Sequence, residues 1–180
     1  HPLDQKNGVP RASLPVPCLQ GVRAAVLTIS DRCSQGQAED KSGPVLSGLL
    51  GALGAQAVVE SLVPDEVNRI QEAIARLIES DRATLIVTTW GTGLSPRDTT
   101  PEAMTGLSGV RLVPGGGEQL RTRGCQSTPL AALSRSNGYL WRGALIVTLP
   151  GSVRAVKEGM QALEPILEHA LLITKGGNHG

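Results

Sequence analysis

Two aspartates, Asp65 and Asp98, stand where a metal-assisted reaction could use them. Asp65 follows a proline at the end of one apolar run, and Asp98 follows Pro-Arg in the loop after another. A carboxylate in such a place can hold Mg²⁺ through one or two oxygens while ligand phosphates complete the octahedron. Helix capping is the alternative, because Asp65 precedes a helical pattern and Thr99 forms a T-x-x-E capping box with Glu102. Capping is the commoner role for one such residue, and both roles can coexist at an exposed first turn.

Glycine turns indicate a second kind of chemistry, the binding of phosphate. Gly91 and Gly93 leave backbone N–H groups unobstructed, and Gly151 and Ser152 precede a helical pattern whose N-terminus favours an anion. The chain contains neither GxxxxGK[ST] nor GxGxxG, so a Walker A loop and a classical dinucleotide fingerprint are excluded. For one glycine pair alone, a tight turn between strand and helix is the plainer interpretation.

The positions of histidine and cysteine exclude several kinds of catalysis. The three histidines lie toward the ends of the chain, at His1, His169 and His179. A central Ser/His/Asp or Cys/His system therefore has no base. The three cysteines are widely spaced and form no CxxC pair, at Cys18, Cys33 and Cys125. They predict reduced thiols and no disulfide framework or zinc site.

The balance of charge and aromatic residues excludes broad classes of partner. The 180 residues carry 17 basic and 16 acidic side chains, so the net charge of +1 attracts the chain neither to nucleic acid nor to anionic membranes. Two tryptophans and one tyrosine are too few for a platform that stacks single-stranded nucleic acid. No apolar run approaches the roughly 18 residues that span a bilayer. We therefore expect no nucleic acid, no membrane and a cytoplasmic location.

Alternating strands and helices must position these groups. Apolar runs predict strands at 24–30, 57–63, 84–89 and 144–151, and helical spacing predicts helices at 44–54, at 65–80 and from 153 through Leu167, kinked or restarted at Pro165. This alternation predicts a three-layer α/β/α domain around a mostly parallel sheet. Ligands in such folds gather at the carboxyl ends of the strands, where the polar residues of this chain stand.

The domain boundaries follow from composition. Residues 1–21 contain four prolines without periodicity and predict an extended tail or linker, residues 22–175 the single domain, and residues 176–180 a flexible C-terminal tail. The first residue is histidine, which suggests a processed product or the C-terminal module of a longer polypeptide.

Five segments, taken together, closely resemble the molybdopterin adenylyltransferase family, which includes the MogA and MoaB proteins of bacteria and the G domains of gephyrin. The segments are LTISDRCSQGQAEDKSGP (27–44), VPDEV (63–67), TTWGTGLSPRDTTPEA (88–103), TPLAALSRS (128–136) and LIVTLPGSVRAVKEGMQALEPILEHAL (145–171). The similarity covers residues 24–172, and GTGLSPRDTTPE is its most specific part.

The resemblance implies a trimeric α/β protein that joins molybdopterin to ATP with Mg²⁺, giving adenylylated molybdopterin and pyrophosphate. This chemistry agrees with the residues, because a phosphate monoester with a second pKa of about 6 is largely ionised at neutrality and needs no histidine base. The alternative is a MoaB-like molybdopterin-binding module without this activity, part of a fused or multidomain cofactor-synthesis protein. Other proteins of molybdenum cofactor synthesis are further expected partners.

The resemblance also assigns roles to individual residues. It makes Asp65 and Asp98 catalytic, with Asp65 on the nucleotide phosphate and Mg²⁺ and Asp98 on the pterin and its phosphate. The nucleotide-binding set is Thr28, Ser30, Asp40, Ser42, Gly43, Gly91, Pro150, Gly151 and Ser152. The molybdopterin-binding set is Thr92, Gly93, Asp98, Ser134 and Arg135. Arg135 would clamp a phosphate as a fork, unless it forms a surface salt bridge instead.

Three departures from the family pattern stand near these residues. Trp90 replaces a glycine of the TTGGTG loop, and its indole either stacks on a flat heterocycle or partly blocks the site. Gly116 replaces the aromatic residue of a PGFGE-like segment. Residues 134–143 are one residue longer than the usual turn, which puts the distances around Ser134 in question.

Overall fold

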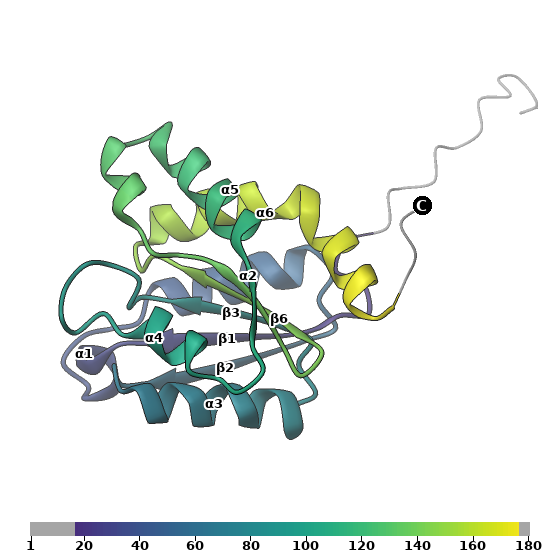
Figure 1. Cartoon of the computed structure of the whole chain (residues 1–180), viewed down its shortest axis with the longest axis horizontal. Helices are drawn as coiled ribbons and strands as arrows, with labels where there is room; N and C mark the ends of the chain where they lie inside the picture. Colours follow the sequence, from purple (N-terminus) through teal and green to yellow (C-terminus); the bar gives the residue numbers. More distant parts are fainter. Residues whose placement is uncertain (1–16, 177–180) are drawn as a thin grey trace, which may run out of the picture.

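A six-stranded sheet with helices on both faces forms the centre of the molecule (Figure 1). The computed structural model describes residues 17–176. The strands are β1 (Arg23–Ile29), β2 (Ala57–Val63), β3 (Leu85–Thr89), β4 (Arg111–Val113), β5 (Gly138–Trp141) and β6 (Ala144–Leu149). The helices are α1 (Asp31–Ser34), α2 (Ser42–Ala52), α3 (Val67–Glu79), α4 (Thr100–Thr105), α5 (Pro114–Cys125), α6 (Val153–Thr174) and a 3₁₀ turn, η1 (Pro129–Leu133).

The strand order is β2-β1-β3-β6-β5-β4. The first four strands in this order are parallel, whereas β5 is antiparallel to β6 and to β4. The mostly parallel three-layer fold predicted from the sequence is thus confirmed, and the antiparallel edge is an addition to it. Arg142 and Gly143 both have positive φ, as the two-residue turn between β5 and β6 requires.

The core lies on both faces of the sheet, which explains why the central strands are apolar throughout. Leu85 and Val87 of β3 pack with α2, α5 and α6, whereas Ile86 packs on the opposite face with α3 and α4. Successive side chains of a strand point to opposite faces, so a strand covered twice has no polar alternation. The predicted helix at 65–80 is confirmed as α3, and it buries Ile70, Ala73, Ile74 and Leu77 along one stripe.

Three details differ from the sequence-based expectations. Helix α6 continues through the exposed Pro165 as one helix, so no restart occurs there. Residues 17–21, expected in the tail, form a turn whose Leu19 is fully buried and donates its N–H to the Leu53 carbonyl at 2.9 Å. The predicted tail at 1–16 and the C-terminal residues 177–180 lie outside the described residues.

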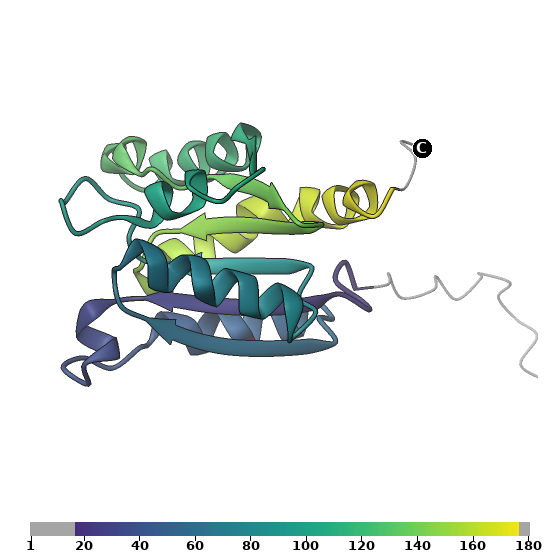
Figure 2. The same cartoon turned by 60° about the horizontal axis from the view of Figure 1, so that its bottom comes forward.

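Parallel strands bring their carboxyl ends to one edge of the sheet. Figures 1 and 2 both show the loop after β1 and the loop after β3 projecting from this same edge. The short connections after β2 and β6, at 64–66 and 150–152, end there as well. The fold therefore brings together four loops that are far apart in the sequence. Within residues 17–176, no helix has the length and apolar character needed to cross a membrane.

Candidate active site

A cavity of about 600 Å³ opens beside the loop after β3. Its walls come from this loop, from α5 and η1, and from the first turns of α6. From the predicted molybdopterin set it is lined by Thr92, Gly93, Asp98 and Ser134, and from the predicted nucleotide set by Gly91, Pro150, Gly151 and Ser152. Sequence reasoning thus identified eight residues that the structure places around one hollow.

Four of the remaining nucleotide-set residues, Thr28, Asp40, Ser42 and Gly43, form a polar network beside this cavity, at the end of β1. Asp40 is its centre: its carboxylate accepts hydrogen bonds from Thr28 Oγ1 at 2.8 Å and from the Gly43 N–H at 2.9 Å. A Cβ on Gly43 would overlap the same carboxylate, so this position requires glycine. Ser42 Oγ donates to the Gly151 carbonyl, which joins the network to the cavity wall.

Ser30 belongs to the same strand end but turns toward α1. Its Oγ accepts the Cys33 N–H at 3.2 Å and so caps this short helix. Ser152 has the matching role at α6, where its Oγ accepts the Ala155 N–H at 3.1 Å. Both hydroxyls therefore act as N-caps of the helices that follow them.

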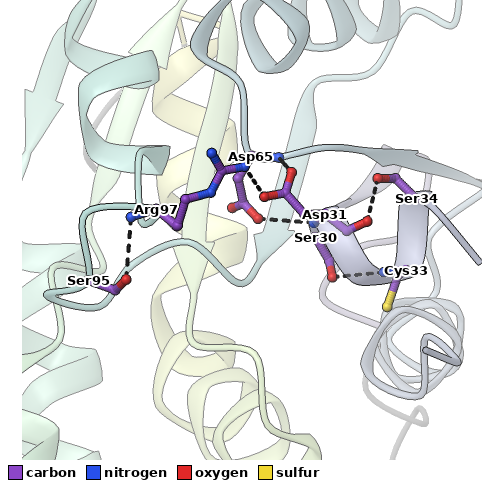
Figure 3. Close-up of polar contacts among 7 residues, drawn as sticks. All are labelled: Ser30, Asp31, Cys33, Ser34, Asp65, Ser95 and Arg97. Carbon is purple, nitrogen blue, oxygen red and sulfur yellow. Dashed lines mark hydrogen bonds and ion pairs between the residues drawn. The ribbon is translucent and has the colours of Figure 1, made fainter. Parts of the chain in front are cut away.

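Asp65 pairs with Asp31 across the ends of β1 and β2, as Figure 3 shows. The Asp65 N–H donates to Asp31 Oδ1 at 2.9 Å, and the Asp31 N–H donates to Asp65 Oδ2 at 3.1 Å. The guanidinium of Arg97 forms an ion pair with Asp31 from the loop after β3. Sequence reasoning missed Asp31 and Arg97. Their signals were SDR directly after the first apolar run and PRD around Asp98, but pairing over 66 residues needs the fold.

The two paired aspartates differ in electrostatics. Burial raises the pKa of Asp65, and the nearby charges of Asp31 and Asp98 raise it further, against a hydrogen bond from the Asp31 backbone that lowers it. The hydrogen bond from Arg97 lowers the pKa of Asp31. A partly buried carboxylate among other carboxylates gains from a bound cation. No cluster of three or more metal-ligating side chains occurs in the described part of the chain, so a cation at Asp65 would also need oxygens from its ligand.

The capping alternative is wrong at both predicted positions. The N-cap residue of α3 is Glu66, which makes no side-chain cap hydrogen bond, and the carboxylate of Asp65 accepts from the Asp31 N–H instead. Thr99 is the cap of α4, but its Oγ1 is buried without a partner in the described structure. Glu102 pairs with Arg135.

Asp98 and Asp65 approach the same turn, Gly91–Gly93. A Cβ on Gly93 would lie 2.7 Å from Asp98 Oδ2, and a Cβ on Gly91 would lie 3.4 Å from Asp65 Oδ1. The Ser95 N–H donates to Asp98 Oδ2 at 2.9 Å and fixes that carboxylate. Gly91 has φ of +76°, and a Cβ there would lie 2.1 Å from Thr100 Oγ1, so this position requires glycine for both conformation and space. The two predicted catalytic carboxylates therefore flank one glycine turn.

Arg135 forms the salt bridge that the sequence left as an alternative to a phosphate clamp. Its guanidinium donates to the carbonyls of Gly93 at 2.9 Å and Asp98 at 2.7 Å, and to Glu102 Oε1 at 2.5 Å. Each of the three guanidinium nitrogens of Arg135 thus donates a hydrogen bond to the protein. Arg135 holds the loop that carries Asp98 and does not line the large cavity.

Ser134 is fixed by its neighbours, and two arginines near it were missed. Ser134 Oγ donates to Ser136 Oγ at 2.9 Å, and Arg121 donates to the carbonyls of Ser134 and Ser136 at 3.2 and 2.7 Å. Arg121 and Arg154 line the cavity from α5 and α6. In the sequence they looked like ordinary surface charges of helices, and no spacing marked them as cavity residues.

The chain has clear relatives among known proteins. Residues 25–169 match the family described as probable molybdopterin binding domain. The molybdenum cofactor biosynthesis bifunctional protein of Synechococcus elongatus is 46% identical over 166 residues, 92% of this chain and 51% of that protein. The molybdopterin adenylyltransferase of Escherichia coli K12 is 37% identical over 145 residues, 79% of this chain and 74% of that protein.

Solved structures agree with these matches. The molybdopterin biosynthesis enzyme MoaB from Thermus thermophilus superposes with a TM-score of 0.78 at 37% identity, covering 86% of this chain and 97% of that one. The chain spans about half the length of the Synechococcus protein and 26% of the related cinnamon protein of Drosophila melanogaster. The resemblance inferred from the sequence is confirmed: the chain belongs to the molybdopterin-binding domain family of molybdenum cofactor biosynthesis.

Proposed function

We propose that this protein is a molybdopterin adenylyltransferase that uses ATP and Mg²⁺. The observation that supports this most strongly is the placement of Asp65 near Gly91 and of Asp98 near Gly93, at one glycine turn. Asp98 lines the cavity, whereas Asp65 belongs to the polar end of β1 and β2. Two substrates could thus meet at the glycine turn, one on each side.

The reaction is a transfer of the adenylyl group to a phosphate oxygen. An oxygen of the molybdopterin phosphate forms a bond to the α-phosphorus of ATP, and the bond from that phosphorus to the bridging oxygen breaks, so that pyrophosphate leaves. The attacking monoester is largely ionised near neutrality, since its second pKa is about 6. No side chain has to remove a proton, and the task of the protein is to position and neutralise charge.

The residues around Asp65 fit a role in holding Mg²⁺. Burial and neighbouring carboxylates raise the pKa of Asp65, and a divalent cation would offset this crowding. When bound, Mg²⁺ would neutralise charge on the phosphates of ATP. The side chain of Arg97 is 68% exposed and forms an ion pair with Asp31. It can supply a second positive charge beside Asp65.

The test is pyrophosphate release with molybdopterin, ATP and Mg²⁺. Asp65→Ala should abolish release, and unchanged turnover in this variant would remove the mechanism. A matched control is Glu60→Gln, which neutralises an exposed carboxylate within β2, away from the strand ends. This control should keep wild-type turnover.

A second function, a molybdopterin-binding module without adenylylation, is favoured by one observation. The Trp90 indole lies against Gly151 in the turn that the nucleotide would use. Tight pterin binding without turnover, and turnover restored by Trp90→Gly, would support this second function. The homotrimer, the cytoplasmic location and the link to other cofactor-synthesis proteins stay predictions from the resemblance.

A further inference from the structure

Trp90 adopts a backbone conformation that is unusual for a large side chain. Its φ is +74°, and the other non-glycine residues with positive φ within residues 17–176 are two arginines, Arg82 and Arg142. Left-handed backbone is unfavourable for a bulky residue. The turn is held by Thr100, whose Oγ1 donates to the Trp90 carbonyl at 3.1 Å and whose N–H donates to the Gly91 carbonyl at 3.1 Å. The hydrogen bonds from Thr100 thus hold Trp90 in this conformation.

One face of the Trp90 indole rests on the backbone of Gly151. A Cβ added to Gly151 would overlap Cδ2, Cε3 and Cε2 of the indole together, so the glycine lies against the flat face of the ring. Nevertheless, 45% of Trp90 is exposed. One face is therefore supported by backbone, and much of the remaining surface is free.

The free surface of Trp90 belongs to the wall of the large cavity. Three exposed leucines line the same cavity: Leu94, Leu130 and Leu133. This part of the wall favours a flat apolar ring. The same cavity is also lined by the glycine turns and by Arg121 and Arg154, so the apolar wall and the phosphate-binding candidates share one hollow.

Trp141 shows how a purely structural indole looks in this molecule. It is only 6% exposed, its Nε1 donates to the Ser108 carbonyl at 2.9 Å, and the Arg142 guanidinium lies 4.2 Å from its ring centre. In the described structure no hydrogen-bond partner is found for the Trp90 indole N–H. Trp90 therefore has the exposure of a binding residue and not the saturated contacts of a core residue.

We propose that Trp90 is a specificity-determining residue whose indole stacks on the flat nitrogen heterocycle of a ligand in the cavity. The shared chemistry is that of a purine or a pterin, both of which present a π face of suitable size. Gly151 backs the ring, so that the indole is held ready before the ligand arrives. The proposal rests on the proposed function only in the choice of these two heterocycles.

The test compares two replacements of the indole. Trp90→Phe keeps an aromatic face, whereas Trp90→Leu keeps apolar bulk without one. Calorimetric titrations with Mg²⁺-ADP and with neopterin monophosphate separate the purine from the pterin. For whichever heterocycle stacks, Trp90→Leu should weaken binding by roughly ten- to a hundredfold and Trp90→Phe by much less. If Trp90→Leu does not fold, Trp90→Gly relieves the backbone conformation and replaces it in the comparison.

A spectroscopic readout identifies the stacked ring directly. In a Trp141→Phe background, Trp90 is the remaining indole of the chain, which has two tryptophans. The stacking ligand should quench its fluorescence in step with binding, and Trp141→Phe should leave the affinity unchanged.

Three results would overturn or separate the proposals. Equal or tighter binding of both ligands by Trp90→Leu and Trp90→Gly would show that the indole only obstructs the cavity, and would leave the proposed function standing. Binding that depends on Trp90 without pyrophosphate release would overturn the adenylyltransferase and keep the stacking role. A wild-type protein that binds neither ligand would overturn both.

Discussion

The polar end of β1 and β2 and the cavity beside β3 and β6 use the same edge of the sheet in opposite ways. At the polar end, carboxylates are already satisfied by the protein: Asp40 by Thr28 and Gly43, and Asp31 by Asp65 and Arg97. The cavity instead exposes leucines and one face of an indole. The comparison indicates that one region supplies preorganised charge, whereas the other supplies a shaped space for a flat ligand.

The Gly91–Gly93 turn lies between these regions, and this explains its composition. A side chain at Gly93 would meet the Asp98 carboxylate, and one at Gly91 would meet Thr100 Oγ1, with Asp65 Oδ1 at van der Waals distance. A reaction that joins two substrates needs such a shared boundary.

The largest expected effect separates the two carboxylates by substrate. Asp65→Asn should lower turnover by about a hundredfold or more, because charge at the reacting phosphate is worth this much in comparable sites. Asp98→Asn should act mainly by raising KM for molybdopterin. Steady-state kinetics with each substrate varied in turn checks both. Identical KM and kcat changes in the two variants would erase the distinction between the regions.

The next effect tests the contact between Trp90 and Gly151. Gly151→Ala should destabilise the fold by about 1–3 kcal/mol, because its Cβ overlaps the indole and forces the ring or the turn to move. Adding Trp90→Gly should recover much of this loss, which urea unfolding of the single and double variants measures as a coupling energy. Strict additivity of the two changes would show that the ring and the glycine do not touch.

Arg135 provides a smaller effect on the loop between the regions. Arg135→Gln removes hydrogen bonds to two backbone carbonyls and Glu102, and should cost about 1–2 kcal/mol in the free energy of unfolding. Arg76→Gln is the matched control, since Arg76 donates one surface hydrogen bond to Ser61 Oγ and its loss should stay below about 0.5 kcal/mol. Chemical denaturation compares the two. Unchanged molybdopterin binding in Arg135→Gln would contradict its role in placing Asp98.

The pH dependence of activity is the finest test of the polar region. The pKa of Asp65 is raised above its ordinary value of 3.8, first by burial, so its protonation should lower activity as the pH drops through this raised value, in addition to protonation of the substrate phosphate with its pKa of about 6. Asp31→Asn removes one charge that raises the pKa of Asp65, and should move this fall to lower pH. A pH–rate profile for both proteins measures the shift; an acidic limb that moves upward in Asp31→Asn would reverse the assignment.

The pKa shifts of Asp65 and Asp31 have opposite directions, so the two residues make the free energy of unfolding depend on pH in opposite ways. A raised folded-state pKa means that protonated Asp65 favours folding, so its contribution declines as the pH rises above 3.8 through the folded value. Asp31 has a lowered pKa through Arg97, so its contribution is present above 3.8 and is lost as the pH falls through its folded value.

Sequence patterns predicted the parts of this fold that have continuous apolar runs or a helical apolar stripe. Such patterns occur at β1, β2, β3 and β6 and along α3, and they predicted the parallel part of the sheet and the edge at which its strands end. The short edge strands and α5 carry no such pattern, since α5 begins with proline and three glycines. Gly116 and Gly117 are explained only by the fold, because the backbone at Gly138 and Ser136 lies within 3.2 and 2.5 Å of a Cβ at these positions.

The sequence identified most residues of the candidate site, but it did not predict their hydrogen-bond and ion-pair partners. Motifs marked Asp65, Asp98 and the glycine turns, but the local capping signals at Thr99 and Glu102 were overridden by the pairing of Glu102 with Arg135. Leu19 is likewise a buried core residue whose backbone N–H bonds to the carbonyl of Leu53, 34 positions away. Such pairings arise from tertiary packing, which no local spacing encodes.

The most direct test of the two-region account is product analysis of the wild-type protein with molybdopterin, Mg²⁺ and ATP labelled at the α-phosphate. We expect adenylylated molybdopterin and pyrophosphate in equal amounts, with the label in the pterin product. Label that stays in ATP while molybdopterin binds tightly, or that appears in free AMP alone, would contradict it.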